Sequence, residues 1–444
     1  MSQTQSIKLS VIVHPAPGLS GTVEVPGDKS IGHRVAMLAG LASGTSKLKR
    51  FPRSGDCIST LRAMESLGAR SFEGEGGVLT IQGTGGRLLE PAGPLNCGNA
   101  GTSIRLLAGM LAGQGMTVQL TGDESLCSRP MGRIKDPLER MGAKIELTGE
   151  KGTAPITIKG GKLKSIDYML PVASAQVKSC VLLAGLFAEG TTTVTEPVPT
   201  RDHTERLFHD LGLPVVVEGL QIKLKGFGQK GPDLKGLTCT VPGDFSSAAY
   251  WMVGAAARKK GSITVKGVGL NPRRTAFLEV LRNFGAAVDV KVRSKPAASE
   301  PIGDVKVTAG KLKGITVGGM DIPNLIDELP LVAVLGALAE GKTEIRNAAE
   351  LRVKESDRIA AMAANLRLMG VEVEEKEDGM IVTGGCTLKP SGAVKSYGDH
   401  RMAMAMAILA TYATEPLVIN NIACVETSYP AFWEDLKKLG GQVE

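Results

Sequence analysis

The chain has 444 residues and a mass of 46.4 kDa, more than one hydrophobic core usually accommodates, so two or more domains are expected. Aromatic residues make up only 4% of the chain and leave few rings on which nucleic-acid bases could stack. The net charge of +7 is scattered without long runs of like charge, which favours small anionic ligands over nucleic acid or a membrane surface.

The chain also lacks the usual signals for export and metal binding. Its first residues contain no basic segment followed by a long apolar one, so no secretory signal is expected. The longest apolar stretches, such as 402–413, are too short to cross a bilayer. The seven cysteines form no C-x-x-C pair and the histidines have no zinc-binding spacing. We therefore expect a cytoplasmic protein with no metal, no cofactor and no membrane segment.

Two kinds of helix alternate along the sequence. Six Ala- and Leu-rich segments open on a polar motif and predict largely buried helices: 27–41, 99–111, 174–187, 244–257, 327–339 and 398–410. Six amphipathic runs each end at a glycine that precedes a strand-like stretch: Gly68, Gly142, Gly212, Gly285, Gly370 and Gly440. Glycine commonly ends a helix because it tolerates the left-handed conformation.

This alternation predicts a repeated structural unit. Each repeat of about 70 residues reads as strand, buried helix, strand, amphipathic helix and strand. Six repeats divide naturally into two lobes of three, with a boundary near residue 242, before the GDFSS motif. The pattern leaves open whether the first strand crosses to the other lobe.

The polar starts of the buried helices indicate where anions bind. The first turn of a helix has unpaired N–H groups and the positive end of the dipole, which together favour phosphate and carboxylate. Eight cations lie at or near these starts: Lys29, Arg34, Arg105, Arg129, Arg201, Lys354, Arg358 and Arg401. Each alone could be a solvated surface residue, but their recurrence in several repeats predicts two substrates with several negative charges.

Acidic residues accompany the cations in the second half of the chain. The candidates for proton transfer are Asp327, Glu328, Glu355, Asp357 and Asp399. Glu355 precedes Arg358 by three residues, so the two can share a helical face and form a structural ion pair instead.

Seven motifs in order resemble the EPSP synthase (3-phosphoshikimate 1-carboxyvinyltransferase) family. They are PGDKS at 26–30 with Arg34, NAGT at 99–102 with Arg105, RPMG at 129–132, SAQ at 174–176, RDHTE at 201–205, RVKESDR at 352–358 and DHRMAM at 399–404. The resemblance implies the α/β (α+β) enolpyruvyl-transferase fold, with three βαβαββ-type units in each of two lobes. The implied lobes are 26–242, and 1–25 plus 243–444, with a cleft and hinge between them.

The resemblance also implies a reaction and a set of ligands. The enolpyruvyl group of phosphoenolpyruvate would move to the 5-hydroxyl of shikimate 3-phosphate. Shikimate 3-phosphate would be held by Lys29, Ser30, Arg34, Ser174, Ala175, Gln176, Arg201, Asp327 and Lys354. Phosphoenolpyruvate would be held by Lys29, Gly101, Arg129, Gln176, Arg358 and Arg401. Asp327 is the candidate base at the hydroxyl, Glu355 the candidate for proton exchange at C3, and Lys29 a stabiliser of negative charge.

Three positions depart from the pattern common among relatives. Leu106 replaces a proline, Ala175 replaces a second serine, and Thr427 stands where many relatives carry a lysine. With RDHTE, these features are similar to the class that often tolerates the inhibitor glyphosate. Gly101 favours sensitivity instead, because a larger residue there would crowd the phosphonate.

Two other functions remain as alternatives. The sister enzyme transfers enolpyruvyl to UDP-N-acetylglucosamine with a loop cysteine, and Cys127 lies near Arg129, but ESLCSRPMG does not resemble that loop. An RNA-binding or RNA-end-processing repeat protein would also be basic, although the sparse aromatics argue against it. A single chain with two lobes needs no partner, so we expect a monomer.

Overall fold

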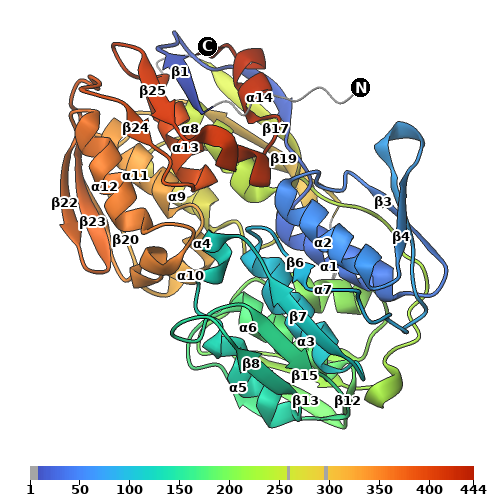
Figure 1. The fold of residues 1–444 in the computed structure, drawn as a ribbon. Coiled ribbons are helices and arrows are strands. Elements are labelled where there is room, and N and C mark those ends of the chain that lie inside the picture. Colours follow the sequence, from blue (N-terminus) through green and yellow to red (C-terminus); the bar gives the residue numbers. More distant parts are fainter. Residues whose placement is uncertain (1–8, 258–260, 295–298) are drawn as a thin grey trace. The chain divides into compact units, whose positions relative to one another are not determined.

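The computed structural model describes residues 9–257, 261–294 and 299–444 (Figure 1). Its contacts divide the chain into two compact units, each with a hydrophobic core of its own. Unit 2 contains Gly27–Pro242 together with Ser299 and Glu300, and unit 1 contains the other described residues. The lobes implied by the family resemblance place Pro26 in the first lobe, and Ser299 and Glu300 in the second. In the structure Pro26 belongs to unit 1, whereas Ser299 and Glu300 belong to unit 2, where they hydrogen-bond to helix α7 (His203–Asp210).

The second repeat of unit 2 shows the structural unit in full. Its elements are β6 (Leu95–Asn96), α3 (Gly101–Ala112), β7 (Thr117–Thr121), the short α4 (Glu124–Cys127), α5 (Gly132–Met141), β8 (Lys144–Leu147) and β9 (Ile156–Lys159). The sheet order is β6-β7-β9-β8, in which β6 and β7 are parallel and the other pairs antiparallel. The register places Thr117 opposite Lys159 and Leu120 opposite Ile156.

The other two repeats of unit 2 follow the same order. The third comprises β11 (Asp167–Met169), α6 (Ala175–Gly185), β13 (Thr191–Thr195), α7 (His203–Asp210), β14 (Val215–Glu218) and β15 (Gln221–Lys225), with a small sheet of β10 (Leu163–Lys164) and β12 (Ala188–Glu189) beside it. The first comprises α1 (Lys29–Leu41), β3 (Thr45–Lys49), α2 (Gly55–Ser66), β4 (Arg70–Glu73) and β5 (Leu79–Gln82). Its sheet is completed by β16 (Thr238–Thr240), from the end of the unit.

Unit 1 repeats the pattern three more times. The fourth repeat comprises α8 (Phe245–Ala256), β17 (Ser262–Gly269), α9 (Ala276–Phe284), β18 (Ala287–Ser294) and β19 (Ile302–Thr308). The fifth comprises β20 (Thr316–Val317), α10 (Ile322–Leu325), α11 (Leu329–Leu338), β21 (Gly341–Ile345), α12 (Arg358–Leu368), β22 (Glu372–Lys376) and β23 (Gly379–Gly384). The sixth comprises β24 (Val394–Lys395), α13 (His400–Ala410), β25 (Leu417–Asn420), α14 (Phe432–Lys438) and β26 (Gln442–Val443). Helix α12 lies along β22 and β23 (Figure 1).

The N-terminal segment completes two sheets of unit 1. Strand β1 (Ser10–His14) pairs antiparallel with β25, and β2 (Gly21–Glu24) pairs parallel with β17. The first strands therefore belong to unit 1, together with residues more than 200 positions away. The sequence pattern left open whether the first strand crosses to the other lobe, and these two pairings show that it does.

Helix packing confirms the two helix classes predicted from the sequence. The buried helices are α1, α3 and α6 in unit 2 and α8, α11 and α13 in unit 1, and every described residue of α13 is buried. Small residues allow these helices to approach closely, since a Cβ on Gly109 would lie only 2.1 Å from the carbonyl oxygen of Cys180. The six repeat glycines all have positive φ, between 70° at Gly212 and 115° at Gly142. This is the left-handed backbone conformation that commonly ends an α-helix. The α/β fold of repeated βαβαββ units is thereby confirmed.

Candidate active site

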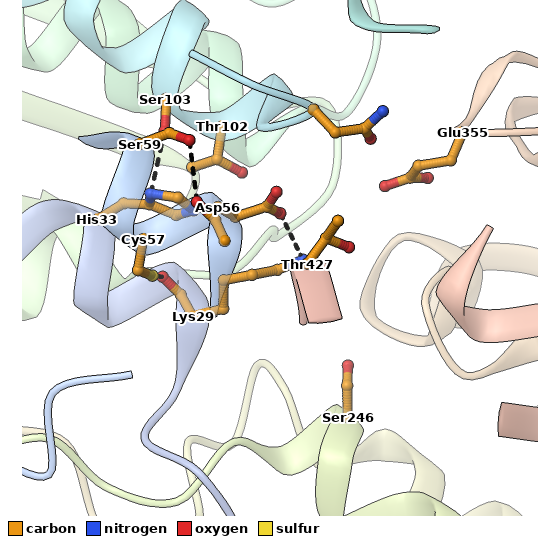
Figure 2. A network of polar contacts seen from close by, with 12 residues as sticks. Lys29, His33, Asp56, Cys57, Ser59, Thr102, Ser103, Ser246, Glu355 and Thr427 are labelled. Atoms are coloured by element: carbon orange, nitrogen blue, oxygen red, sulfur yellow. Dashed lines mark hydrogen bonds and ion pairs between the residues drawn. The ribbon is translucent and has the colours of Figure 1, made fainter. Parts of the chain in front are cut away.

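In unit 2, helix α1 presents Lys29 in its first turn. The side chain of Asp28 accepts a hydrogen bond from the backbone N of Ile31 at 2.9 Å and so caps the helix. The Lys29 Nζ atom lies 2.8 Å from Oδ2 of Asp56, which is in the first turn of α2 (Figure 2). Both side chains are largely buried, so the carboxylate fixes the position of the ammonium group. Asp56 was not among the residues predicted from the sequence.

His33 lies one turn further along α1, with its imidazole facing two hydroxyl groups. Its Nδ1 is 2.7 Å from Oγ1 of Thr60 and 3.2 Å from Oγ of Ser103, which Figure 2 shows beside the ring. Burial, and then the positive charges of Lys29 and Arg34, hold the pKa of His33 well below its usual value. The ring is therefore neutral at pH 7, which suits an orienting role.

Arg34 uses all three guanidinium nitrogens on neighbouring groups. Its Nε donates to Oγ1 of Thr204 at 2.8 Å, Nη2 to Oγ of Ser179 at 2.8 Å, and Nη1 to the carbonyl oxygen of Ser30 at 2.7 Å. Burial lowers the pKa of Arg34 to about 10, with Glu205 opposing the shift, so the group stays charged at neutral pH. These hydrogen bonds hold the positively charged guanidinium group of Arg34 in a fixed position between α1, α6 and α7.

Two arginine side chains, Arg105 and Arg129, lie beside the first turn of α3. Arg129 donates from Nη2 to Oδ1 of Asn99 at 2.6 Å and from Nη1 to the Asn99 carbonyl at 3.2 Å. A Cβ added to Gly101 would lie 2.9 Å from Nη1 of Arg105 and 3.1 Å from Nη1 of Arg129. Two guanidinium groups therefore face the start of α3, an arrangement suited to an anion.

The start of α6 is joined to the start of α3 by side-chain amides and hydroxyls. Gln176 accepts from Nη1 of Arg105 at 2.9 Å and donates to Oγ1 of Thr102 at 3.0 Å. Ser174 caps α6 by accepting from the backbone N of Val177, and Ala175 is the first residue of the helix. The structure thus brings the NAGT, RPMG and SAQ motifs together.

The RDHTE motif at the start of α7 has several structural contacts. Glu205 lies 2.6 Å from Nζ of the fully buried Lys178, which also lies 3.0 Å from Glu196. His203 Nδ1 is 2.6 Å from Glu300. These contacts fix α7, which begins two residues after Arg201.

In unit 1, Arg358 is surrounded by three carboxylates. Its Nε donates to Oδ2 of Asp399 at 2.7 Å, Nη2 lies 2.5 Å from Oε2 of Glu355, and Nη1 lies 3.6 Å from Oδ1 of Asp327. Burial alone would lower the pKa of Arg358, but Asp399 and Glu355 outweigh it and raise the pKa. Asp399 also caps α13 by accepting from the backbone N of Arg401 at 2.9 Å.

Arg401 is held by backbone and hydroxyl oxygens. Its Nη1 donates to the carbonyl oxygen of Asp327 at 2.7 Å and to Oγ of Ser246 at 3.2 Å, while Nη2 lies 3.5 Å from Oδ1 of Asp327. Burial opposes its charge, but Asp327 and Glu328 outweigh burial and raise the pKa. The Asp327 carboxylate therefore lies within 3.5 and 3.6 Å of the two arginines, and joins Arg401 to Arg358.

Lys354 lies at the edge of this cluster. Its Nζ is 3.6 Å from Oε1 of Glu350, and its side chain is 26% exposed. Burial lowers its pKa, with Glu350 and Asp327 opposing the shift. The predicted residues Asp327, Lys354, Glu355, Arg358 and Arg401 thus form one cluster within unit 1.

Three residues in or beside these clusters were missed from the sequence: Asp56, Ser246 and Arg274. Their positions at helix starts could have marked them as candidates, since Asp56 and Ser246 lie in the first turn of a helix and Arg274 shortly precedes one. Nothing in the sequence pairs them with Lys29, Arg401 or Glu328, because those partners are 27 to 155 residues away. Cys127, the candidate for the loop cysteine of the sister enzyme, is the last residue of α4, and its thiol donates to the Gly122 carbonyl oxygen at 3.5 Å.

The described ranges contain no group of three or more His, Cys, Asp or Glu side chains that are placed to hold a metal ion. Across the same ranges, the structure has no helix of the length and apolar character needed to cross a membrane.

Comparisons with known proteins give the family. The model of the EPSP synthase (3-phosphoshikimate 1-carboxyvinyltransferase) family matches residues 13–436. A 3-phosphoshikimate 1-carboxyvinyltransferase of Akkermansia muciniphila is 50% identical over 95% of this chain and 98% of that protein. The structure of EPSP synthase from Acinetobacter baumannii is 43% identical, covers 98% of this chain and 99% of its own, and has a TM-score of 0.84. The enolpyruvyl transferase NikO from Streptomyces tendae, 20% identical with a TM-score of 0.78, shares the fold. This chain belongs to the EPSP synthase family.

Proposed function

We propose that this chain transfers the enolpyruvyl group of phosphoenolpyruvate to the 5-hydroxyl of shikimate 3-phosphate, releasing phosphate. The observation that carries the proposal is the family match, which extends over residues 13–436 and includes every motif of the two cation clusters. Relatives with this name are 44% to 50% identical over nearly the whole chain. The product, 5-enolpyruvylshikimate 3-phosphate, lies on the shikimate pathway to the aromatic amino acids.

The charges of the clusters fit substrates with several anionic groups. In unit 2, Lys29 lies in the first turn of α1, Arg34 and Arg105 lie one turn further along α1 and α3, and Arg129 follows α4. The positive dipole ends of α1 and α3 add to the charge of these cations. Lys29, Ser30, Arg34, Ser174, Ala175, Gln176 and Arg201, with Asp327 and Lys354, are assigned to shikimate 3-phosphate. Lys29, Gly101, Arg129 and Gln176, with Arg358 and Arg401, are assigned to phosphoenolpyruvate. Closure of two lobes around a hinge remains the prediction made from the sequence.

The reaction is an addition followed by an elimination. A proton adds to C3 of phosphoenolpyruvate while the 5-hydroxyl oxygen bonds to C2 and loses its proton. The tetrahedral intermediate then loses a proton from C3 and expels phosphate from C2. Asp327 is assigned as the base at the hydroxyl, because its carboxylate lies 3.6 Å from Nη1 of Arg358 and 3.5 Å from Nη2 of Arg401, two of the cations assigned to phosphoenolpyruvate. Glu355, with 21% of its side chain exposed and anchored to Arg358, is assigned to the proton exchange at C3.

Negative charge on the phosphate and carboxylate groups is balanced by fixed cations. Arg358 and Arg401 stay protonated at all working pH values, since neighbouring carboxylates raise their pKa. Lys29, held by Asp56, supplies a further charge. These groups need little reorganisation on binding because hydrogen bonds already hold them in place.

Glyphosate, an anionic phosphonate, is proposed to compete with phosphoenolpyruvate at the Gly101 site. The space beside Gly101 is bounded by Arg105 and Arg129, whose guanidinium groups would approach a phosphonate. Noncompetitive inhibition against phosphoenolpyruvate would contradict this assignment.

A monomer in the cytoplasm is the proposed state. All seven cysteines are free, as a reducing compartment would leave them.

Phosphate release from phosphoenolpyruvate tests the function directly. The purified chain is incubated with shikimate 3-phosphate or, separately, with UDP-N-acetylglucosamine. We expect release only with shikimate 3-phosphate. Release with the nucleotide sugar, or with neither acceptor, would refute the proposal. RNA retention on a filter, tested at low and high salt, is expected to remain at background.

A further inference from the structure

Arg274 lies outside the predicted binding residues, although its partners adjoin them. It sits in the turn between β17 and α9, where its backbone N donates to the Asn271 carbonyl at 2.8 Å. Its side chain is 4% exposed and lies over the ring of Phe245 at 5.6 Å. A guanidinium group buried to this extent requires a specific partner.

That partner is the carboxylate of Glu328, the residue that precedes α11. Nη1 of Arg274 donates to Oε2 of Glu328 at 2.6 Å, and Nη2 donates to Oγ of Ser246. Ser246 in turn donates to Oε1 of Glu328 at 2.6 Å. The Glu328 side chain is fully buried, so Arg274 supplies the nearest charge that balances it.

Arg401 is the second cation near Glu328, at a greater distance. Its Nη1 lies 3.8 Å from Oε1 of Glu328, but it donates to the Asp327 carbonyl at 2.7 Å and to Ser246 at 3.2 Å. Without Arg274, the buried carboxylate would lack its close partner. Arg401 could then supply the missing charge only by turning away from the Asp327 carbonyl.

We propose that Arg274 is a positioning residue for binding of the anionic donor substrate. By pairing with Glu328, it leaves Arg401 directed by Ser246 and the backbone of Asp327. The inference rests on the proposed function, in which Arg401 binds phosphoenolpyruvate. It assigns a role to a residue that touches neither substrate in the proposed scheme.

Four variants test this role: Arg274→Met, Arg274→Lys, Arg274→Met with Glu328→Gln, and the control Arg282→Gln. Arg282 is an exposed residue of α9, so its replacement removes the same charge away from the cluster. The measurements are kcat and the KM of each substrate, with circular dichroism to confirm folding. We expect Arg274→Met to raise the KM for phosphoenolpyruvate about tenfold, or about 1.4 kcal/mol, while the KM for shikimate 3-phosphate stays within about twofold.

The double variant supplies the decisive comparison. Glu328→Gln removes the unbalanced charge, so the double variant is expected to return the KM for phosphoenolpyruvate to within about threefold of the wild type. Arg274→Lys is expected to be intermediate, because one ammonium group cannot reproduce the fork that reaches both Glu328 and Ser246. The control is expected to match the wild type.

Three results would overturn the positioning role. They are a folded Arg274→Met with unchanged KM values, a parallel rise in both KM values, and a double variant no better than the single one. If Arg274→Met does not fold, the other two variants decide. A wild-type KM for phosphoenolpyruvate in Arg274→Lys, together with a raised KM in the double variant, would also overturn the positioning role. A wild type without phosphate release refutes the proposed function itself, whereas an active wild type matched by Arg274→Met refutes only this inference.

Discussion

Replacing Asp399 tests the buried charge cluster of unit 1. Its Oδ2 accepts from Nε of Arg358 at 2.7 Å and from Ser356 at 3.1 Å, and its Oδ1 caps α13 through the backbone N of Arg401. Both Asp399 and Arg358 are almost fully buried, so neutralising Asp399 leaves a buried guanidinium with less compensation. Glu355 remains as a partner of Arg358 and limits the loss.

The magnitude follows from these contacts. Breaking a buried ion pair costs about 3 to 5 kcal/mol, and because Glu355 remains beside Arg358, the expected loss for Asp399→Asn is about 3 kcal/mol. The asparagine keeps a carbonyl oxygen for the helix cap, whereas alanine loses it, which adds about 1 kcal/mol. We therefore expect Asp399→Ala to lower the free energy of unfolding of unit 1 by about 4 kcal/mol.

Urea unfolding followed by tryptophan fluorescence measures this loss. The chain has two tryptophans, Trp251 and Trp433, and both lie in unit 1, so the signal reports that unit. Asp289→Asn is the matched control, because Asp289 is exposed on β18 and its replacement should change stability by less than about 0.5 kcal/mol. An Asp399→Asn variant as stable as the control would refute the reasoning about the buried pair, and equal losses for Asn and Ala would refute the capping contribution.

Three further predictions concern acidity, the donor site and proton transfer. Because the folded state holds the pKa of His33 below its unfolded value of about 6.5, the resulting stabilisation is present above pH 6.5 and is lost as the pH falls toward the folded-state pKa. Circular dichroism of urea unfolding at pH 7.5 and 5.0 should show a smaller drop in His33→Gln than in the wild type, and equal drops would exclude this contribution. Gly101→Ala places a methyl group 2.9 Å from Nη1 of Arg105. In steady-state kinetics we therefore expect the KM for phosphoenolpyruvate and the inhibition constant of glyphosate both to rise about tenfold or more. Unchanged values would show that the arginine side chains move aside freely. Asp327→Asn and Glu355→Gln should each lower kcat about 100-fold in steady-state kinetics, and full turnover in both would remove the proton-transfer roles.

Much of the local structure could be predicted from the sequence because it depends on short-range rules. Each repeat glycine follows an amphipathic run, and each proved to have the positive φ that only a residue without a Cβ adopts easily. The starts of the buried helices could be predicted in the same way, since Asp28, Ser174 and Asp399 are residue types that cap helices and each caps one here.

The pairing of charges could not be predicted in the same way. Asp28, next to Lys29, is used as a helix cap, and the partner of Lys29 is Asp56 on another helix. Likewise, Arg274 in its turn gives no indication that it will meet Glu328, 54 residues later. Such pairs form only when packing removes both groups from water, where an unpaired charge is costly.

The sequence by itself therefore determined the six repeats, their helix ends and the motifs of the family. The tertiary structure decided which strands complete each sheet, as when β1 joins β25 and β16 joins β3, and which carboxylate holds each cation. The physical reason is one of range. Helix ends and capping depend on a few neighbouring residues, whereas sheet completion and buried ion pairs depend on groups brought together only when the cores are packed.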